Sequence, residues 1–227
     1  MKKLDAVRWG VVGTGTIAQQ FVEDIKLVSG SKVTAVCSRS LSSASKLGQL
    51  CKDASCFCNL AEFMQDETID VVYVATPNHT HFDIALASLK AGKSVLVEKP
   101  LVMSSAEIEK LQAAVKANHV LLMEGIWTHF LPVIDHVHKH LNKGGLGTIK
   151  RIDADLAFQH PFDAESRFYD KSKGGGALLD LGIYPLSLAI AFMGKPDRVD
   201  GCCNAAPERL FQFCQSARNI GPSSILT

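Results

Sequence analysis

A short glycine-containing stretch near the N-terminus is the first place where residue types and spacing could support chemistry. Residues 13–18 read GTGTIA, which fits the pattern G-x-G-x-x-A between an apolar run and a helix-like run. Gly13 permits a tight turn, and Gly15 lets the backbone approach a pyrophosphate at the free N–H groups of a helix N-terminus. The alternative is a bare structural turn, but the context favours a dinucleotide site formed by Gly13, Thr14, Gly15, Thr16 and Ile17.

The end of the second predicted strand indicates which dinucleotide is bound. An NAD site usually places an acidic side chain there for the ribose hydroxyls, whereas this chain has Cys37, Ser38, Arg39 and Ser40. A guanidinium with neighbouring hydroxyls suits a 2′-phosphate, because arginine can donate two charge-assisted hydrogen bonds to it. We therefore expect NADP(H) as the cofactor, bound through Ser38 and Arg39. The alternative is that Arg39 is a solvated loop residue.

Three further residues could carry out proton transfer. Lys99 follows a short apolar run, at the end of a predicted strand where ligands bind in open α/β sheets. Asp180 and Tyr184 are four residues apart and therefore share one face of a helix. A cation beside a phenol favours the phenolate and so makes a better acid/base group at working pH. Tyr184 is the candidate for that group. The alternative is a core tyrosine whose hydroxyl has found a polar partner.

Alternating strand and helix patterns position the first of these residues. Buried strands are predicted at 7–12, 32–38, 70–76, 94–100 and 120–125, and helices at 16–28, 43–51, 81–92 and 104–119. This regular order predicts an α/β fold, a doubly wound parallel sheet of the Rossmann type, over residues 1–124. The glycine turn, Arg39 and Lys99 each fall just after a strand.

The pattern changes after about residue 125. A helix is predicted over 129–144, a longer alternating strand over 147–158, and an apolar helix over 177–194 after a glycine-rich turn. We expect an incomplete α+β, open-sheet substrate domain over residues 125–203, followed by a divergent, poorly ordered tail over 204–227.

The composition argues against several function classes. The 227 residues are 47% hydrophobic with a net charge of +1, which suits one or two globular domains and gives no reason to expect nucleic-acid binding. The apolar runs fall short of the roughly 20 residues that span a bilayer, and the N-terminus lacks the apolar core of a signal peptide. The seven cysteines, an odd number, indicate reduced thiols in a cytoplasmic protein.

No metal site is expected. His136 and His140 would share a helix face, but no glutamate lies between them in metalloprotease spacing and no third ligand is apparent. Cys56 and Cys58 form a C-x-C pair, and residues 202–203 are adjacent cysteines, but neither arrangement has zinc-site spacing.

Four stretches together resemble the Gfo/Idh/MocA family of oxidoreductases. They are GVVGTGTIA, VATPNHTH, VLVEKPL and GGGALLDLGIYPLSLA, in the family's order, and the resemblance covers residues 6–201. The stretch MEGIWTHFLP and Tyr184 make the chain most similar to the NADP-dependent dihydrodiol dehydrogenase branch, where tyrosine replaces the histidine usual in the family. That branch usually has arginine at the position of His129.

The resemblance implies roles for individual residues. Lys99, Tyr184 and Asp180 would be catalytic: Tyr184 would exchange a proton with the substrate oxygen while hydride moves between the substrate carbon and the nicotinamide. The substrate would be a small diol, sugar or dicarbonyl. A core position is the alternative for Trp127. The implied cofactor contacts beyond the glycine turn are Thr76, Pro77, Asn78, His81, Glu98 and Lys99, and the implied pocket residues are Trp127, Asp180 and Tyr184.

The C-terminal part departs from the family. Members usually continue into a large open sheet that forms the back of the substrate site and commonly the interface of a homodimer. Residues 197–204 resemble the start of its next strand, but the following residues match nothing in the family. We hypothesise a truncated form, so a catalytically inactive dinucleotide-binding or regulatory protein is the alternative function. A nucleotide-binding domain of another class would explain the glycines but not Lys99, Asp180 and Tyr184.

Overall fold

The chain forms two compact units that divide after Gly125. The computed structural model describes residues 6–159, 161, 163 and 166–201, so the expected tail over 204–227 and the adjacent cysteines at 202–203 lie outside the described residues. A parallel sheet and its helices make up the first unit, whereas the described residues of the second unit contain helical elements only.

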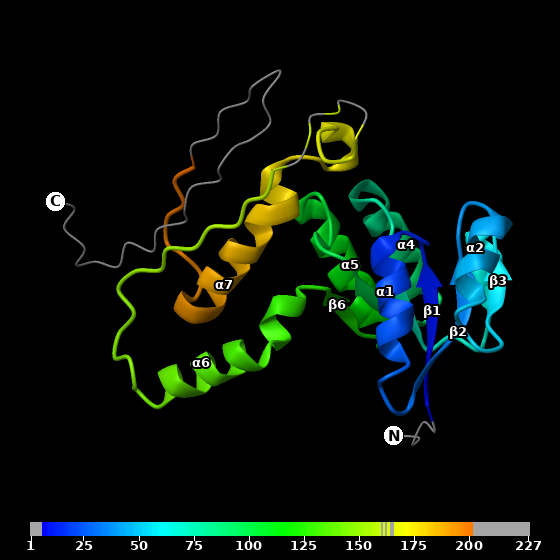
Figure 1. Cartoon of the computed structure of the whole chain (residues 1–227), viewed down its shortest axis with the longest axis horizontal. Helices are drawn as coiled ribbons and strands as arrows, with labels where there is room; N and C mark the ends of the chain where they lie inside the picture. Colours follow the sequence, from blue (N-terminus) through cyan, green and yellow to red (C-terminus); the bar gives the residue numbers. More distant parts are fainter. Residues whose placement is uncertain (1–5, 160, 162, 164–165, 202–227) are drawn as a thin grey trace. The chain divides into compact units, whose positions relative to one another are not determined.

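The first unit is built on a six-stranded sheet in the order β3-β2-β1-β4-β5-β6, and all of its strand pairs are parallel (Figure 1). The chain leaves β1 toward β2 on one side and later returns to add β4 on the other, so β1 and β4 form the switch point at which such sheets bind ligands. The strands are β1 (Val7–Val12), β2 (Ser31–Cys37), β3 (Ser55–Phe57), β4 (Val71–Val74), β5 (Ser94–Val97) and β6 (Leu122–Glu124).

Helices cover both faces of this sheet. One core cluster joins the strands to α1 and α2, and a second joins them to α3, α4 and α5. Successive strand residues alternate between the two clusters: Val72 and Val74 pack in one, and Tyr73 packs in the other. The helices are α1 (Thr16–Ile25), α2 (Leu41–Gly48), α3 (Leu60–Gln65), α4 (His81–Lys90) and α5 (Ser105–Asn118).

The Rossmann prediction is therefore confirmed, with two elements added. Five of the six strands and four of these helices lie where the apolar patterns place them. The sequence reading missed β3 and α3, because three and six residues are too few to show a clear period. Ser104 and Glu107 form a capping box at the start of α5.

The second unit contains the two predicted helices. They are α6 (Pro132–Asn142) and α7 (Ile183–Met193), and they contact each other through the rings of His138 and Phe192, whose centroids lie 4.6 Å apart. Shorter elements are the 3₁₀ turns Trp127–Phe130 and Lys171–Lys173 and the π-helical turn Leu178–Gly182.

The strand predicted over residues 147–158 is not formed, and residues 197–201 do not begin one. Alternation in the sequence shows which side chains would share a face, but a strand also needs a neighbour to accept and donate its backbone hydrogen bonds. The described residues of the second unit supply no such neighbour. The open sheet expected within 125–203 is thus absent from the described residues of the second unit.

The stretch Lys171–Met193 is 23 residues long and, by length and composition alone, apolar enough to cross a membrane. Lys171, Lys173 and Asp180 lie within this stretch, so it is not an uninterrupted apolar run. A single such helix is weak evidence, because a core helix of a soluble protein meets the same criteria.

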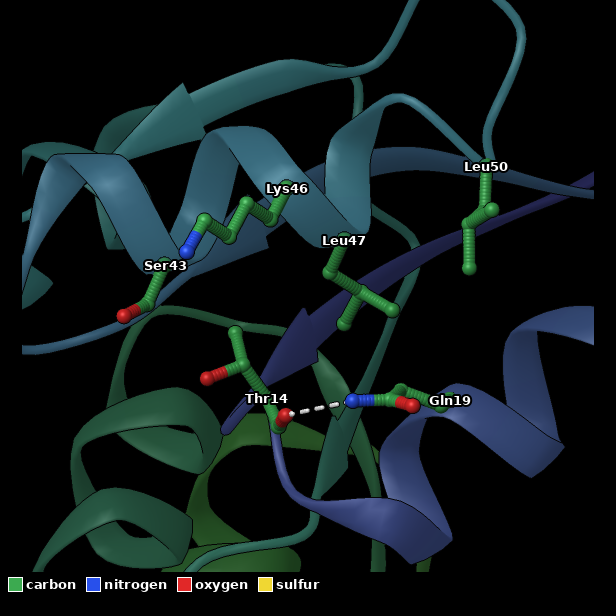
Figure 2. A pocket seen from close by; sticks show the side chains of 6 residues that line it. All are labelled: Thr14, Gln19, Ser43, Lys46, Leu47 and Leu50. Atoms are coloured by element: carbon green, nitrogen blue, oxygen red, sulfur yellow. Dashed lines mark hydrogen bonds between the residues drawn. The ribbon is translucent and has the colours of Figure 1, made fainter.

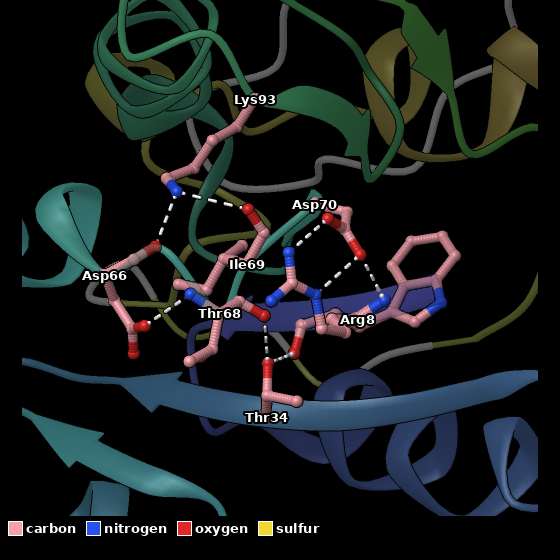
Figure 3. Close-up of polar contacts among 8 residues, drawn as sticks. Arg8, Thr34, Asp66, Thr68, Ile69, Asp70 and Lys93 are labelled. Atoms are coloured by element: carbon pink, nitrogen blue, oxygen red, sulfur yellow. Dashed lines mark hydrogen bonds and ion pairs between the residues drawn. The ribbon is translucent and has the colours of Figure 1, made fainter. Parts of the chain in front are cut away.

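A polar network ties the strand beginnings together at the edge opposite the candidate site (Figure 3). Arg8 on β1 donates to the carboxylate of Asp70, with Nη2–Oδ1 and Nε–Oδ2 distances of 2.7 and 3.0 Å. Lys93, before β5, is 6% exposed and donates its ammonium to the carbonyls of Asp66 and Ile69. These bonds fix where β1, β4 and β5 begin.

We predict that Asp70→Asn lowers the free energy of unfolding at pH 7. The hydrogen bonds from Arg8 hold the pKa of Asp70 below its usual value, so the folded state favours the carboxylate. That stabilisation is present above the unfolded pKa of about 4 and is lost as pH falls through the lower folded value. Urea unfolding from pH 7 to pH 2 should show the variant and wild type converging in acid. Glu23→Gln, which removes an exposed ion pair with Lys26, should have little effect. Equal stabilities at pH 7 would contradict the prediction.

Candidate active site

The cofactor residues predicted in the first unit gather at one edge of its sheet. Thr16 and Ile17 begin α1 after β1, Ser38 and Arg39 follow β2, Thr76 follows β4, and Glu98 and Lys99 follow β5. These four strands are neighbours in the order β2-β1-β4-β5. Because parallel strands end at the same edge, the four loops surround the switch point, where open α/β sheets bind ligands.

The two glycines of the turn are required for different reasons. Gly13 has φ of +107°, and a Cβ placed on it would collide with the carbonyl of Ala75, so the fold itself requires glycine there. Gly15 is the N-cap of α1 with an ordinary extended conformation, and a Cβ built on it meets no atom within 4 Å. Among the residues that the structure describes, none demands glycine at position 15. The open space before the helix N-terminus suits a pyrophosphate. A glycine at this position lets the pyrophosphate come close to the backbone, because it has no side chain.

The loop after β2 lies beside this turn. The hydroxyl oxygens of Thr14 and Ser38 are 3.4 Å apart, and the amide of Gly13 donates to the carbonyl of Cys37 at 2.9 Å. Arg39 is exposed, and in the part of the chain that the structure describes no carboxylate lies within ion-pair distance of it. Its guanidinium is therefore available to an anionic ligand.

The loop after β4 is held by a fully buried histidine. His81, the first residue of α4, is 0% exposed, and its Nδ1 and Nε2 each lie 2.8 Å from a carbonyl oxygen, that of Pro100 and that of Thr76 respectively. Burial lowers the pKa of His81, while the two carbonyl contacts act in the opposite direction. A neutral imidazole has one N–H and can donate to only one of the two carbonyls. The ring thus joins the β4 and β5 loops and presents no nitrogen to solvent. Pro77 and Asn78 complete the loop before α4.

The turn after β5 is held by two carboxylates. Glu98 accepts the hydroxyl of Tyr73 at 2.6 Å through Oε1 and the amide of Lys99 at 3.3 Å through Oε2. On the far side of Pro100, the amide of Leu101 donates to Glu124 Oε1 at 2.7 Å. The Lys99–Pro100 peptide bond is cis. The Lys99 turn is therefore anchored before and after the lysine.

Tyr73 and Glu124 were missed by the sequence reading. Tyr73 sits inside an apolar strand, and Glu124 ends the short strand β6 within the stretch MEGIWTHFLP, so neither was given a role of its own. Tyr73 is 2% exposed and stacks on Phe21 of α1, with ring centroids 3.9 Å apart. Burial and the neighbouring Glu98 raise its pKa far above the usual value, so it remains a hydrogen-bond donor.

We expect Tyr73→Phe to lower the free energy of unfolding by about 1–3 kcal/mol, because it leaves a partly buried carboxylate oxygen of Glu98 without its donor. Urea unfolding of Tyr73→Phe, Glu98→Gln and the double variant measures the coupling between the two side chains. A double-variant loss equal to the sum of the single losses would show that the pair contributes nothing.

In the second unit, the structure brings two of the predicted pocket residues together. The indole N–H of Trp127 donates to the hydroxyl oxygen of Tyr184 at 3.3 Å. Trp127 is 60% exposed, which rules out the alternative of a core tryptophan. Asp180 lies in the π-helical turn that runs directly into α7, which carries Tyr184. Pro185 has no amide to donate to the carbonyl of Leu181, which is a physical reason for irregular helix there, and such π-helical turns are frequent at functional sites.

Two family models match the chain. One, described as an oxidoreductase family with an NAD-binding Rossmann fold, matches residues 7–126; the other, a GFO/IDH/MocA C-terminal domain, matches residues 134–216.

Curated relatives include trans-1,2-dihydrobenzene-1,2-diol dehydrogenase from Xenopus laevis, at 36% identity over 86% of this chain and 59% of the relative. The NADP(+)-dependent scyllo-inositol 2-dehydrogenase of Bacillus subtilis is 33% identical over 85% and 60%. The D-xylose 1-dehydrogenase (NADP(+)) of Hypocrea jecorina is 33% identical over 80% and 51%. The chain therefore spans between half and two thirds of the length of these relatives.

The chain is also similar to solved structures of proteins in complex with NADP or NAD. A 3-ketoreductase from Actinomadura kijaniata in complex with NADP and TDP-benzene has a TM-score of 0.72 at 29% identity, over 83% of this chain and 58% of that one. GenD2 from gentamicin A biosynthesis, in complex with NAD, has a TM-score of 0.71 at 29% identity, over 85% and 55%.

Proposed function

Because this chain belongs to the Gfo/Idh/MocA family of oxidoreductases, we propose that it transfers a hydride between NADP and a small diol, sugar or dicarbonyl. The donor would be a CH–OH or CH–CH group. The observation that carries the proposal is Gly15, a glycine at the start of α1 that no packing in the described part of the chain requires. A nearby dinucleotide explains it.

The choice of NADP over NAD rests on the loop after β2. That loop offers Ser38 and the exposed Arg39, and it has no acidic residue to accept hydrogen bonds from ribose hydroxyls. The names of the relatives agree with the choice of NADP only in part: two of the dehydrogenases carry NADP(+) in their names, and one structural relative was solved with NAD.

We propose that the cofactor is contacted by residues of the loops that follow β1, β2, β4 and β5, while His81 holds two of these loops together. The contacts are Gly13, Thr14, Gly15, Thr16, Ile17, Ser38, Arg39, Thr76, Pro77, Asn78, Glu98 and Lys99.

NADP, when bound, supplies or accepts the hydride. The amides of the first turn of α1 bind pyrophosphate oxygens, and the anchored turn after β5 fixes the backbone of Lys99. Tyr184 exchanges a proton with the substrate oxygen, and Trp127 orients its hydroxyl by donating to it. Asp180 orients substrate hydroxyls. These roles for Lys99, Asp180 and Tyr184 are proposals drawn from the family resemblance.

The proposal is tested by titrating the protein with NADPH and NADH and following cofactor fluorescence, then measuring turnover of the substrates named for its relatives. Tight NADPH binding with weaker NADH binding and steady turnover is the expected result. Binding without turnover of any of them would favour the alternative, an inactive dinucleotide-binding protein. No binding of either cofactor would overturn the proposal.

We also propose a reducing, cytoplasmic location. The family resemblance implies a homodimer, but the sheet that commonly forms its interface is absent from the described residues of this chain. Cys37, Cys51, Cys56 and Cys58 are free thiols in the described chain, as expected in a reducing compartment. Sedimentation at several concentrations would test the dimer.

A further inference from the structure

The hydroxyl of Tyr73 reaches toward the edge of the sheet at which the candidate site lies. Tyr73 on β4 pairs in register with Leu96 of β5, but its hydroxyl donates to Glu98, two residues further along the chain. The amide of Glu98 still donates to the carbonyl of Val74 at 2.9 Å, so the strand pairing continues to this residue. Leu96 and Glu98 therefore share one face of the sheet, and the length of the tyrosine ring spans the two positions.

Glu98 lies between β4 and the segment that follows β6. A Cβ built on Gly125 would be 3.2 Å from the carbonyl oxygen of Val97 and 3.4 Å from Glu98 Oε1. The amide of Gly125 donates to that same carbonyl at 2.7 Å. The chain after β6 thus passes close to the half-buried carboxylate and limits the directions in which it can turn.

The two oxygens of this carboxylate have different partners. Oε1 of Glu98 accepts the hydroxyl of Tyr73 at 2.6 Å, and Oε2 accepts the amide of Lys99 at 3.3 Å. A carboxylate is planar, so the short bond to Oε1 also fixes the direction of Oε2. The bond from the Lys99 amide is long, and a modest rotation of the carboxylate would break it. The hydroxyl of Tyr73 therefore governs how Glu98 holds the backbone of the lysine.

Tyr73 is itself held in one place. Its ring is 2% exposed and stacks on Phe21 with centroids 3.9 Å apart, and the ring of Trp9 meets Phe21 edge-on at 5.2 Å. Burial and the neighbouring Glu98 keep the pKa of Tyr73 far above its usual value, so the hydroxyl remains a donor at working pH. A buried donor of this kind suits positioning and not proton exchange.

We propose that Tyr73 is a positioning residue for the reaction: through Glu98 it fixes the backbone of Lys99 and hence the place from which the lysine acts. This rests on the proposed function, to which it adds a residue that acts without touching substrate or cofactor. The other side of the turn is held separately, because the amide of Leu101 donates to Glu124. Loss of the Tyr73 hydroxyl should therefore loosen the turn at Lys99 and leave it anchored at Leu101.

The first test compares turnover with cofactor binding in Tyr73→Phe, which removes the hydroxyl and keeps the ring. The variant should lower kcat by about 10–100-fold, because a misplacement on the order of 1 Å can cost about 100-fold in rate. The Kd for NADPH should change little, since the glycine turn after β1 is untouched. Turnover and fluorescence titration on the same preparation separate the two quantities.

Asp70→Asn is the matched control. It removes an acceptor of Arg8 hydrogen bonds just before β4, at the opposite edge of the sheet, and is also expected to lower the stability of the fold. It should leave kcat unchanged. An unchanged kcat in Tyr73→Phe would overturn the inference. Equal losses of kcat in both variants would also overturn it, because the loss would then follow stability and not the place of Lys99.

Hydrogen exchange at single amides, measured by NMR, tests the inference without turnover. In Tyr73→Phe the Lys99 amide should exchange about 10-fold faster than in wild type, the effect of losing one weak hydrogen bond. The Leu101 amide, which Glu124 accepts, should keep its wild-type rate. Equal exchange at Lys99 in the two proteins, or equal acceleration at Lys99 and Leu101, would overturn the inference.

The two measurements also separate this inference from the proposed function. Wild-type protein that turns over substrate, with a Tyr73→Phe variant of equal kcat, would overturn the positioning role alone. Wild-type protein that binds NADPH without turnover would overturn the proposed reaction and with it any role of Tyr73 in catalysis. The exchange rates would then still decide whether Tyr73 holds the Lys99 turn.

Discussion

Gly15→Val is expected to lower the affinity for NADPH by about 100-fold, which corresponds to about 2.7 kcal/mol of binding free energy. The free energy of unfolding should fall by no more than about 1–2 kcal/mol, because valine is a poorer N-cap residue than glycine. A Cβ at position 15 meets no atom of the described residues within 4 Å, and the backbone there is extended, which suits valine. The branched side chain would occupy the space that a pyrophosphate needs. Fluorescence titration and urea unfolding measure the two quantities.

Gly13→Ala is the matched variant, and its main effect should be on the stability of the fold. The positive φ and the collision with the carbonyl of Ala75 disfavour any side chain at this position. We expect a loss of more than about 2 kcal/mol in the free energy of unfolding. Gly15→Val protein that is stable and binds NADPH like wild type would show that the cofactor does not approach this turn.

Lys99→Met should lower kcat by about 10²–10⁴-fold, the range contributed by acid/base groups, while NADPH still binds. Methionine keeps much of the length of the side chain and removes its charge. The backbone of the turn should not move, because Glu98 accepts the amide of Lys99 and Glu124 accepts that of Leu101. Turnover and cofactor titration on the same preparation separate loss of chemistry from loss of binding.

Lys90→Met controls for the loss of a lysine, since Lys90 lies exposed in the last turn of α4. Tyr184→Phe should also reduce kcat, and the double variant with Lys99→Met should lose little more than either single variant if the two groups act in one step. Unchanged turnover in Lys99→Met would remove this lysine from the mechanism. Independent, multiplicative losses would separate its role from that of Tyr184.

The sequence by itself determined the parts of this protein whose causes are local. The glycine turn, the apolar strands and the helix caps depend on residues within a few positions of one another, so β1, α1, β2, α4, β5 and α5 lie where their patterns predict. Once a parallel sheet is predicted, its strands must end at one edge. Residue order alone therefore placed Gly15, Arg39, Thr76 and Lys99 at one edge of the sheet.

Only the tertiary structure decided what holds and completes that site. Tyr73 bonds to Glu98 across 25 positions of sequence, and Leu101 to Glu124 across 23. Each pairing exists because β4, β5 and β6 are neighbours in the sheet, which no local pattern encodes. A cavity lined by Gln19 of α1 and by Ser43, Lys46 and Leu47 of α2 likewise forms only because the fold brings these two helices side by side (Figure 2). The strand expected over 147–158 shows the same limit: its alternation is local, but a strand forms only where a second strand lies beside it.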